Sequence, residues 1–347
     1  MAGDSGTTGI VLRYYERSQD KSGTGLAQFR SLWDETFDDP PEFAEYYYQD
    51  VCAGNKMLGA YAGTELVGMI HLNPYRVCMG DAEADSYYIV GVAVKKRLRR
   101  RGIMRLMMSR VLADMGEWGC RFTFLMPEKR EYYAGFGFES VYETCVMQFR
   151  LDDDGGAAVR LRTEPEEKVK SNIVDIDTLS REQMGGLAEY INKKLSEQYR
   201  FFSKRSAEYL RSMCREHRCQ HGGAALLDRE RDFCLFSYDI YGNIMYVERF
   251  ELLAYPAAAG LLYHFVQDIL AFAKERHCTS CRITVPEQLA ALYAAERISD
   301  EAEISNTNEE KEAFYVSDGH GIMALSLSER TFSVDKMKKT SFFDEIV

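Results

Sequence analysis

The strongest chemical feature of this sequence is a basic cluster, because residues 95–101 read KKRLRRR in a chain whose formal net charge is −11. The preceding residues 86–94, SYYIVGVAV, are nearly all apolar or aromatic, which predicts a strand buried on both faces. After the cluster, apolar residues at helical spacing predict a helix from about 103 to 118. A turn at 95–102 would therefore lie at a helix N-terminus, where backbone N–H groups and arginines attract an anion.

The cluster also admits two other interpretations, a solvated basic loop and a targeting or nucleic-acid patch. The acidic remainder of the chain argues against general nucleic-acid binding, which depends on neutralising phosphates. The same negative field favours a cationic small substrate, since it attracts amines. The position between a buried strand and an amphipathic helix favours a phosphate site.

Further candidates for chemistry follow the next predicted strand, at 121–127. Glu128 and Lys129 come at its end, and the stretch EYYAGFGF carries Tyr132 and Tyr133. A phenol can donate a proton to a leaving group, although either tyrosine could equally pack against a sheet edge. His71, in the predicted strand 66–72, is a possible base, but a lone histidine in an apolar strand is more often a core residue.

A rival signal lies further along the chain. Cys214, His217, Cys219 and His221 are closely spaced, and Cys278 and Cys281 follow at the spacing CxxC. These residue types suit zinc, but the spacing of the first four matches no common zinc finger. Incidental thiols and surface histidines are favoured, so no metal is expected. Nine scattered cysteines in a chain of this size predict reduced thiols and a cytoplasmic location.

The predicted elements follow nearly the same order before and after residue 150. The first half (residues 1–150) is predicted to contain helices at 26–37 and after Pro40, strands at 56–61, 66–72 and 86–94, the helix at 103–118, and strands at 121–127 and 138–150. The second half (residues 151–290) is predicted to contain helices at 180–198 and 204–217, strands at 223–228, 233–239 and 243–252, a helix at 257–276 and a strand at 281–285. The pattern predicts an α/β fold with a mixed sheet, present twice. The second copy lacks the basic turn, because residues 251–260, ELLAYPAAAG, contain no Lys or Arg.

The segment VAVKKRLRRRGIMRLMM resembles the acetyl-CoA motif of the GNAT acetyltransferases, with Met104 where glycine or alanine is usual. Together with FTFLMP and EYYAGFGF, it looks like the "enhanced intracellular survival" family. That resemblance is specific over about 56–150 and architectural over 151–290. It implies a catalytic GNAT domain at 1–150 and a degenerate GNAT-like domain at 151–290. The short C-terminal segment at 291–347 corresponds to a reduced sterol-carrier-like module, with its tail docking toward the active site.

The resemblance also implies roles for individual residues. Backbone groups of Val92, Ala93 and Val94 would bind the pantetheine amides, and Glu128 and Lys129 would lie beside the pantetheine arm. The phosphates would be held by the turn and the helix start, namely Arg99, Arg100, Arg101, Gly102, Ile103, Met104 and Arg105. Acetyl-CoA is the expected co-substrate.

Catalytic roles come from the same resemblance. Tyr133 would be the general acid that protonates the CoA thiolate, and the terminal carboxylate of Val347 would be the general base, with Glu128 and His71 as alternatives. The implied activity is direct transfer of acetyl to a primary amine, such as a small cationic amine, an aminoglycoside, a polyamine or a lysine side chain. A non-catalytic acyl-CoA-binding or regulatory protein is the alternative. We expect no membrane span and no nucleic-acid partner, and the resemblance admits a homo-oligomer.

Overall fold

The computed structural model describes residues 7–151, 172–229, 232–253, 260–293, 314–327, 337 and 341–342. The elements of the first half are β1 (Ile10–Tyr14), η1 (Arg17–Gln19), α1 (Thr24–Thr36), α2 (Pro41–Tyr46), η2 (Tyr47–Val51), β2 (Lys56–Ala62), β3 (Glu65–Met79), β4 (Ala82–Val94), η3 (Lys96–Leu98), α3 (Ile103–Glu117), β5 (Phe122–Leu125), α4 (Glu131–Ala134) and β6 (Glu139–Arg150). The predicted order of helices and strands is confirmed here, except that β1 was not anticipated.

The elements of the second half also appear in the predicted order, with short additions. They are β7 (Asn172–Asp175), η4 (Ile176–Thr178), α5 (Arg181–Gln198), β8 (Phe201–Ser203), α6 (Ala207–Arg218), β9 (Gly223–Arg229), β10 (Asp232–Tyr241), β11 (Ile244–Leu252), α7 (Leu261–Glu275) and β12 (Ser280–Pro286). The C-terminal segment contributes β13 (Phe314–Ser326) and β14 (Ser341–Phe342). The sequence also predicts a linker at 151–158, LDDDGGAA, and an acidic, polar loop at 296–312. Apart from Leu151, both segments lie outside the described residues.

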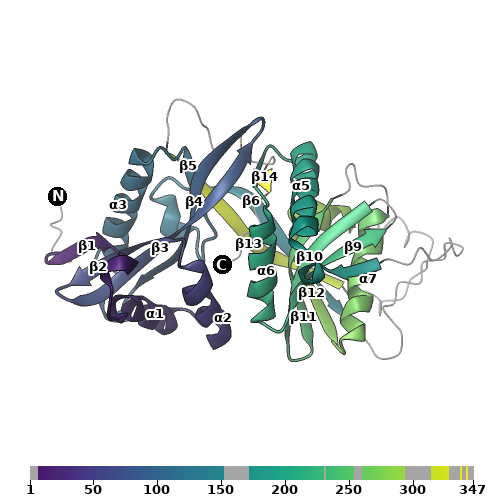
Figure 1. Cartoon of the computed structure of the whole chain (residues 1–347), viewed down its shortest axis with the longest axis horizontal. Coiled ribbons are helices and arrows are strands. Elements are labelled where there is room, and N and C mark those ends of the chain that lie inside the picture. Colours follow the sequence, from purple (N-terminus) through teal and green to yellow (C-terminus); the bar gives the residue numbers. More distant parts are fainter. Residues whose placement is uncertain are drawn as a thin grey trace, which may run out of the picture.

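The described strands join in one mixed sheet that runs through both halves (Figure 1). Its order is β1-β2-β3-β4-β5-β13-β6-β12-β11-β10-β9-β7. In each half an antiparallel meander ends in a strand that pairs in parallel with the next one, β4 with β5 and β11 with β12. A helix connects each parallel pair, α3 in the first half and α7 in the second, as a parallel connection requires. The two halves therefore share one topology.

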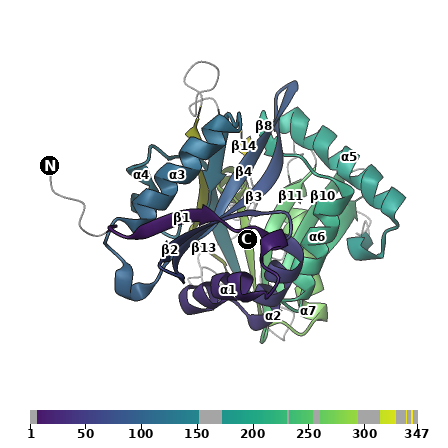
Figure 2. The same ribbon diagram turned by 60° about the vertical axis from the view of Figure 1, so that its left-hand side comes forward.

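Helices cover both faces of the sheet (Figures 1 and 2). In the first half α3 packs on one face with Ile70 and Leu125, while α1 and α2 pack on the other with Met69 and Phe124. In the second half α7 covers one face, and α5 and α6 cover the other. Side chains of α1, α2, α5 and α6 belong to a single apolar core, which joins the halves.

Further backbone pairing joins the first half to the C-terminal segment and to the second half. The C-terminal strand β13 inserts between β5 and β6, with Met323 opposite Leu125. The long β3–β4 hairpin reaches the second half, where β8 pairs with β3 and β14 pairs with β8. The C-terminal segment thus completes the sheet beside β5. None of the helices in the described part of the chain has the length and apolarity that crossing a bilayer requires.

Candidate functional site

The middle of β4 contains a bulge. Along the β3–β4 ladder, Met69 lies opposite Ala93 and His71 lies opposite Val90, so β4 has one residue more than β3 over this stretch. Gly91, within the bulge, has φ of +60°, a conformation that favours glycine. A bulge leaves its extra residue out of the ladder, so backbone groups at this point of β4 are available to another partner.

Strands β4 and β5 diverge next to this bulge. Their parallel pairing consists of Tyr88 opposite Phe124, and β5 ends one residue later at Leu125. On its other side β4 stays paired, with Ala93 and Val94 opposite Met69 and Gly68 of β3. The side of residues 92–94 that faces β5 therefore has no ladder partner among the described strands. An extended ligand can add there as a strand does.

The basic turn leads from β4 into α3, whose N-terminus carries no side-chain cap. Gly102 is the N-cap residue with φ of +81°, and Arg100 also has a positive φ, of +64°. A left-handed non-glycine residue costs about 1 kcal/mol or more, so the surrounding chain must hold this turn. By contrast, α5 begins with a complete capping box at Ser180. The first N–H groups of α3 remain available for an external anion.

The cations of residues 95–105 divide into two groups. Lys95 and Arg97 bind Glu65 at 2.7 Å and 2.5 Å, and these hydrogen bonds, that of Arg97 first, lower the pKa of Glu65 to about 2. The Nε of Arg99 donates to the carbonyl oxygen of Val94 at 3.1 Å. The second group is exposed and has no side-chain partner in the described part of the chain: Lys96, Arg100, Arg101 and Arg105. These four place unneutralised positive charge at the start of α3.

Tyr133 and Tyr132 differ sharply in their surroundings. Tyr133, on α4, is 9% exposed and packs edge-to-face against Phe138. Burial first, then the charge of Glu128 and the neighbouring Tyr132, raise the pKa of Tyr133 to about 12. Tyr132 is 49% exposed, with the ammonium of Lys129 6.0 Å from its ring centre. Tyr133 is therefore the buried phenol, and it keeps its proton at neutral pH.

The candidate bases lie in different places. His71 is fully buried on the α1/α2 face, where its Nδ1 lies 3.1 Å from the Tyr47 hydroxyl. Desolvation lowers the pKa of His71 to about 3, so it is a weak proton acceptor at neutral pH. Glu128 is exposed in the loop after β5, together with Lys129. Val347 lies outside the described residues, which end at β14.

The cysteines and histidines of the second half are engaged separately. Nδ1 of His217 lies 2.8 Å from Oδ1 of Asp239, and Sγ of Cys219 donates to the carbonyl of Arg215. Within the described residues, no three His, Cys, Asp or Glu side chains group in a way that could hold a metal ion. All nine cysteines lie in the described part and are free thiols.

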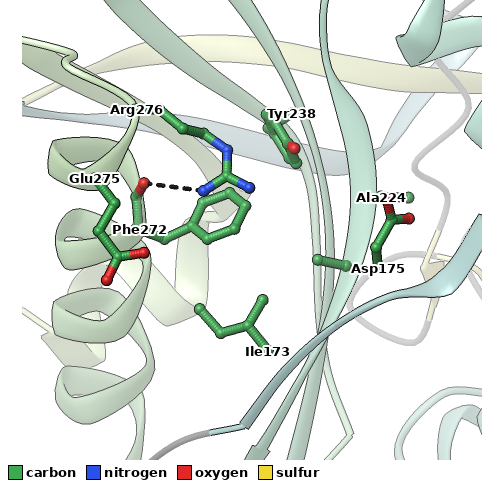
Figure 3. Close-up of a pocket in the computed structure, with 8 residues that line it drawn as sticks. Ile173, Asp175, Ala224, Tyr238, Phe272, Glu275 and Arg276 are labelled. Atoms are coloured by element: carbon green, nitrogen blue, oxygen red, sulfur yellow. Dashed lines mark hydrogen bonds between the residues drawn. The ribbon is translucent and has the colours of Figure 1, made fainter.

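A cavity of 390 Å³ lies in the second half, between β7, β9, β10 and the last turn of α7 (Figure 3). Phe272 forms one wall, and the Arg276 guanidinium stacks 3.3 Å from the centre of its ring. Arg276 follows the C-terminal end of α7, whereas the free cations of the first half lie at the N-terminal end of α3. This cavity therefore does not correspond to the basic turn.

Sequence reasoning missed two residues that shape the site, Gly91 and Trp33. A glycine inside an apolar strand is itself a signal for a bulge. Trp33 belongs to the apolar stripe of the helix predicted at 26–37, and no local pattern in the sequence indicates that its ring lies against β4. A Cβ placed on Gly91 would come within 2.7 Å of Cζ3 of Trp33.

Comparisons with known proteins identify a family for part of the chain. Residues 22–141 match the family described as acetyltransferase (GNAT) domain. No curated protein sequence matches the chain. Residues 22–141 thus belong to an acetyltransferase domain of the GNAT type, and the protein that carries it is an acyltransferase enzyme.

Solved structures extend the likeness in fold over both halves. A probable N-acyltransferase from Enterococcus faecalis has a TM-score of 0.63 at 13% identity, covering 92% of this chain and 73% of that chain. A GCN5-related N-acetyltransferase from Anabaena variabilis has a TM-score of 0.61 at 13% identity, and the match covers 92% of this chain and 73% of that chain. Eis1 from Mycobacterium abscessus has a TM-score of 0.57 at 14% identity, and the match covers 90% of this chain and 72% of that chain.

Proposed function

We propose that this acyltransferase moves an acetyl group from acetyl-CoA directly to a primary amine. One observation carries the proposal: four exposed cations without a partner in the described structure surround an uncapped helix N-terminus, next to a strand whose edge is open. A nucleotide with several phosphates and a long amide-bearing arm fits both parts of this site. The phosphates would bind the turn, and the arm would add to the open side of β4.

The cofactor contacts follow from the placement of each residue. Arg99, Arg100, Arg101 and Arg105 would offer charge to the phosphates, while Gly102, Ile103 and Met104 would offer the backbone N–H groups of the first turn. Val92, Ala93 and Val94 would bind the amides of the pantetheine arm. Glu128 and Lys129 would flank that arm from the loop after β5.

The transfer needs one proton donor and one proton acceptor. The amine nitrogen attacks the thioester carbonyl carbon, a C–N bond forms, and the C–S bond breaks with its electron pair going to sulfur. Tyr133 would supply the proton or hydrogen bond that stabilises this sulfur, since its phenol stays protonated. The proton leaving the amine would go to the terminal carboxylate of Val347, with exposed Glu128 as the alternative.

The remaining parts of the chain would shape the acceptor pocket. We propose a catalytic domain at 1–150 and a second GNAT-like domain at 151–290 that binds no cofactor. In this proposal α5 and α6, which share a core with α1 and α2, help to wall the amine site. Free thiols at all nine cysteines support a reducing, cytoplasmic location.

A thiol-release assay tests the function. Purified protein is incubated with acetyl-CoA and a panel of a polyamine, an aminoglycoside and a lysine peptide, and free CoA is followed over time. We expect amine-dependent CoA release together with mass-detected acetylation of at least one amine. CoA binding without amine-dependent release from any member would instead indicate a non-catalytic acyl-CoA-binding protein.

A further inference from the structure

The ring of Trp33 forms a wall directly against the β4 bulge. Cζ3 and Cε3 of this ring lie 2.7 Å and 3.3 Å from the position that a Cβ on Gly91 would occupy. Trp33 is 3% exposed, so the wall belongs to the packed core of the α1/α2 face. There is no room for even a methyl group between the bulge backbone and the indole at this point.

Several contacts fix the orientation of this indole. It stacks on Tyr47 with ring centres 4.6 Å apart and planes at 27°. Its Nε1 donates to Oδ2 of Asp39 at 2.8 Å, which ties the ring to the α1–α2 connection. A ring held on one face by stacking and at its edge by a hydrogen bond does not turn aside without losing both contacts.

The proposed cofactor position directs the acyl group toward this wall. If the phosphates bind the turn at 99–105, the pantetheine arm runs back along β4 past Val94, Ala93 and Val92. These three residues of extended backbone span about 10 Å. The thioester then lies at the bulge, and any carbons beyond the carbonyl continue toward Gly91 and the indole.

We propose that Trp33 sets the acyl-chain specificity of this enzyme and restricts the donor to acetyl or another short acyl group. This inference rests on the proposed function, because it takes the acyl-CoA site to be the turn and open edge of β4. Trp33 acts here by excluding volume, and it takes no part in proton transfer.

Calorimetric titration of CoA, acetyl-CoA and hexanoyl-CoA tests the proposal without knowledge of the amine. Native protein is expected to bind hexanoyl-CoA about 100-fold more weakly than acetyl-CoA, since four added methylenes meet a fixed ring. In Trp33→Ala this difference should shrink at least tenfold. Trp33→Phe, which keeps an aromatic ring of smaller size, should fall between the two and guards against misfolding of the alanine variant.

The matched control is Tyr48→Phe, because Tyr48 meets the Trp33 ring edge-on at 5.8 Å and the change keeps its own ring. It should leave the ratio of acetyl-CoA to hexanoyl-CoA affinity unchanged. If Trp33 had only a structural role, Trp33→Ala would bind all three ligands more weakly by the same factor and the ratio would be preserved. That result would overturn the proposal. Equal affinity of native protein for the two acyl-CoAs would also overturn it. If native protein did not bind CoA at all, the proposed function would be rejected instead.

Discussion

The starts of α3 and α7 show how one backbone arrangement supports two different surfaces. Gly102 and Gly260 are the N-cap residues of these helices, both have φ of +81°, and neither helix has a side-chain cap. Residues 95–101 supply six Lys and Arg side chains in the first half, whereas residues 251–260 supply none in the second. Backbone geometry alone therefore offers an N-terminus, and the side chains of the preceding turn decide whether a polyanion binds there.

The strands preceding these helices, β4 and β11, share a bulge but differ in the extent of their parallel pairing. Both contain a bulge, at Gly91 in β4 and at Glu248 in β11, where Ser237 and Tyr238 lie opposite Arg249 and Val247. β4 pairs with β5 at one position, but β11 pairs with β12 at four, from Ile244 to Val247. The parallel pairing before the bulge is thus more extensive in the second half. In both halves it stops before the bulge, among the described strands.

Several buried polar side chains meet around α6 in the second half, whereas aromatic rings pack around Trp33 of α1 in the first half. His217 lies against Asp239, and Arg249 lies 3.3 Å from Glu216. Burial raises the pKa of both Asp239 and Glu248 to about 7. Arg205 and Glu251 form a fully buried ion pair nearby. Such pairs hold a defined structure, and losing one partner is costly, so we interpret this network as a structural replacement for a site.

The largest expected effect comes from removing the charge that distinguishes the two helix starts. The double change Arg100→Glu and Arg101→Glu should weaken CoA binding by about 100- to 10,000-fold, since each charge-assisted bond contributes ~1.5–3 kcal/mol. Isothermal titration calorimetry with CoA measures this loss of affinity. The control reverses two exposed cations of the second half, Arg181→Glu with Lys193→Glu, and alters net charge equally. Equal losses in both variants would mean that the overall field, and not the turn, attracts CoA.

A smaller loss is expected from the buried phenol of the first half. Tyr133→Phe should keep CoA affinity and lower kcat by about 100-fold, the size of a general-acid contribution. Steady-state thiol release with saturating acetyl-CoA measures this change. Tyr132→Phe is the matched control, because Tyr132 is exposed and should be neutral. If Tyr132→Phe lowered kcat and Tyr133→Phe did not, the general acid would be Tyr132.

Loss of the C-terminal carboxylate is expected to lower turnover by a smaller factor than Tyr133→Phe does. Removing Ile346 and Val347, or adding a C-terminal tag, should lower turnover at least about tenfold, because an amine of pKa ~10 must lose a proton before it attacks. CoA affinity and thermal unfolding should stay unchanged, which calorimetry and circular dichroism can follow. An N-terminal tag serves as control. Full activity of the C-terminally tagged protein would exclude Val347 and direct attention to Glu128→Gln.

The smallest effect is predicted for the second half. CoA should bind with a stoichiometry of one per chain, and Arg276→Ala, in the cavity of Figure 3, should change its affinity by less than about twofold. Arg276 is chosen because it is the cationic side chain of that cavity. A stoichiometry of two would break the comparison, since it would give the second half a working cofactor site.

Local signals in the sequence were sufficient to predict most elements, including the basic turn that precedes α3. The helical spacing of Met107, Met108 and Val111 predicted α3, whose buried face includes all three. The contrast between KKRLRRR and ELLAYPAAAG predicted which half would carry charge at its helix start. β1 was missed because IVLRY is a short edge strand in a polar stretch, where periodicity is weak.

Only the tertiary structure decided how distant segments meet around β4. The insertion of β13 between β5 and β6 depends on strand pairing across almost 200 residues, and no local pattern encodes such a partner. Tyr132 and Tyr133 have identical chemistry in the sequence, and only the tertiary structure shows that Tyr133 is buried while Tyr132 is exposed. The contact of Trp33 with Gly91 required both a bulge and a helix packed over it. Sequence thus determined residue types and local periodicity, whereas burial, pKa and the contact of Trp33 with the β4 bulge arise from long-range packing.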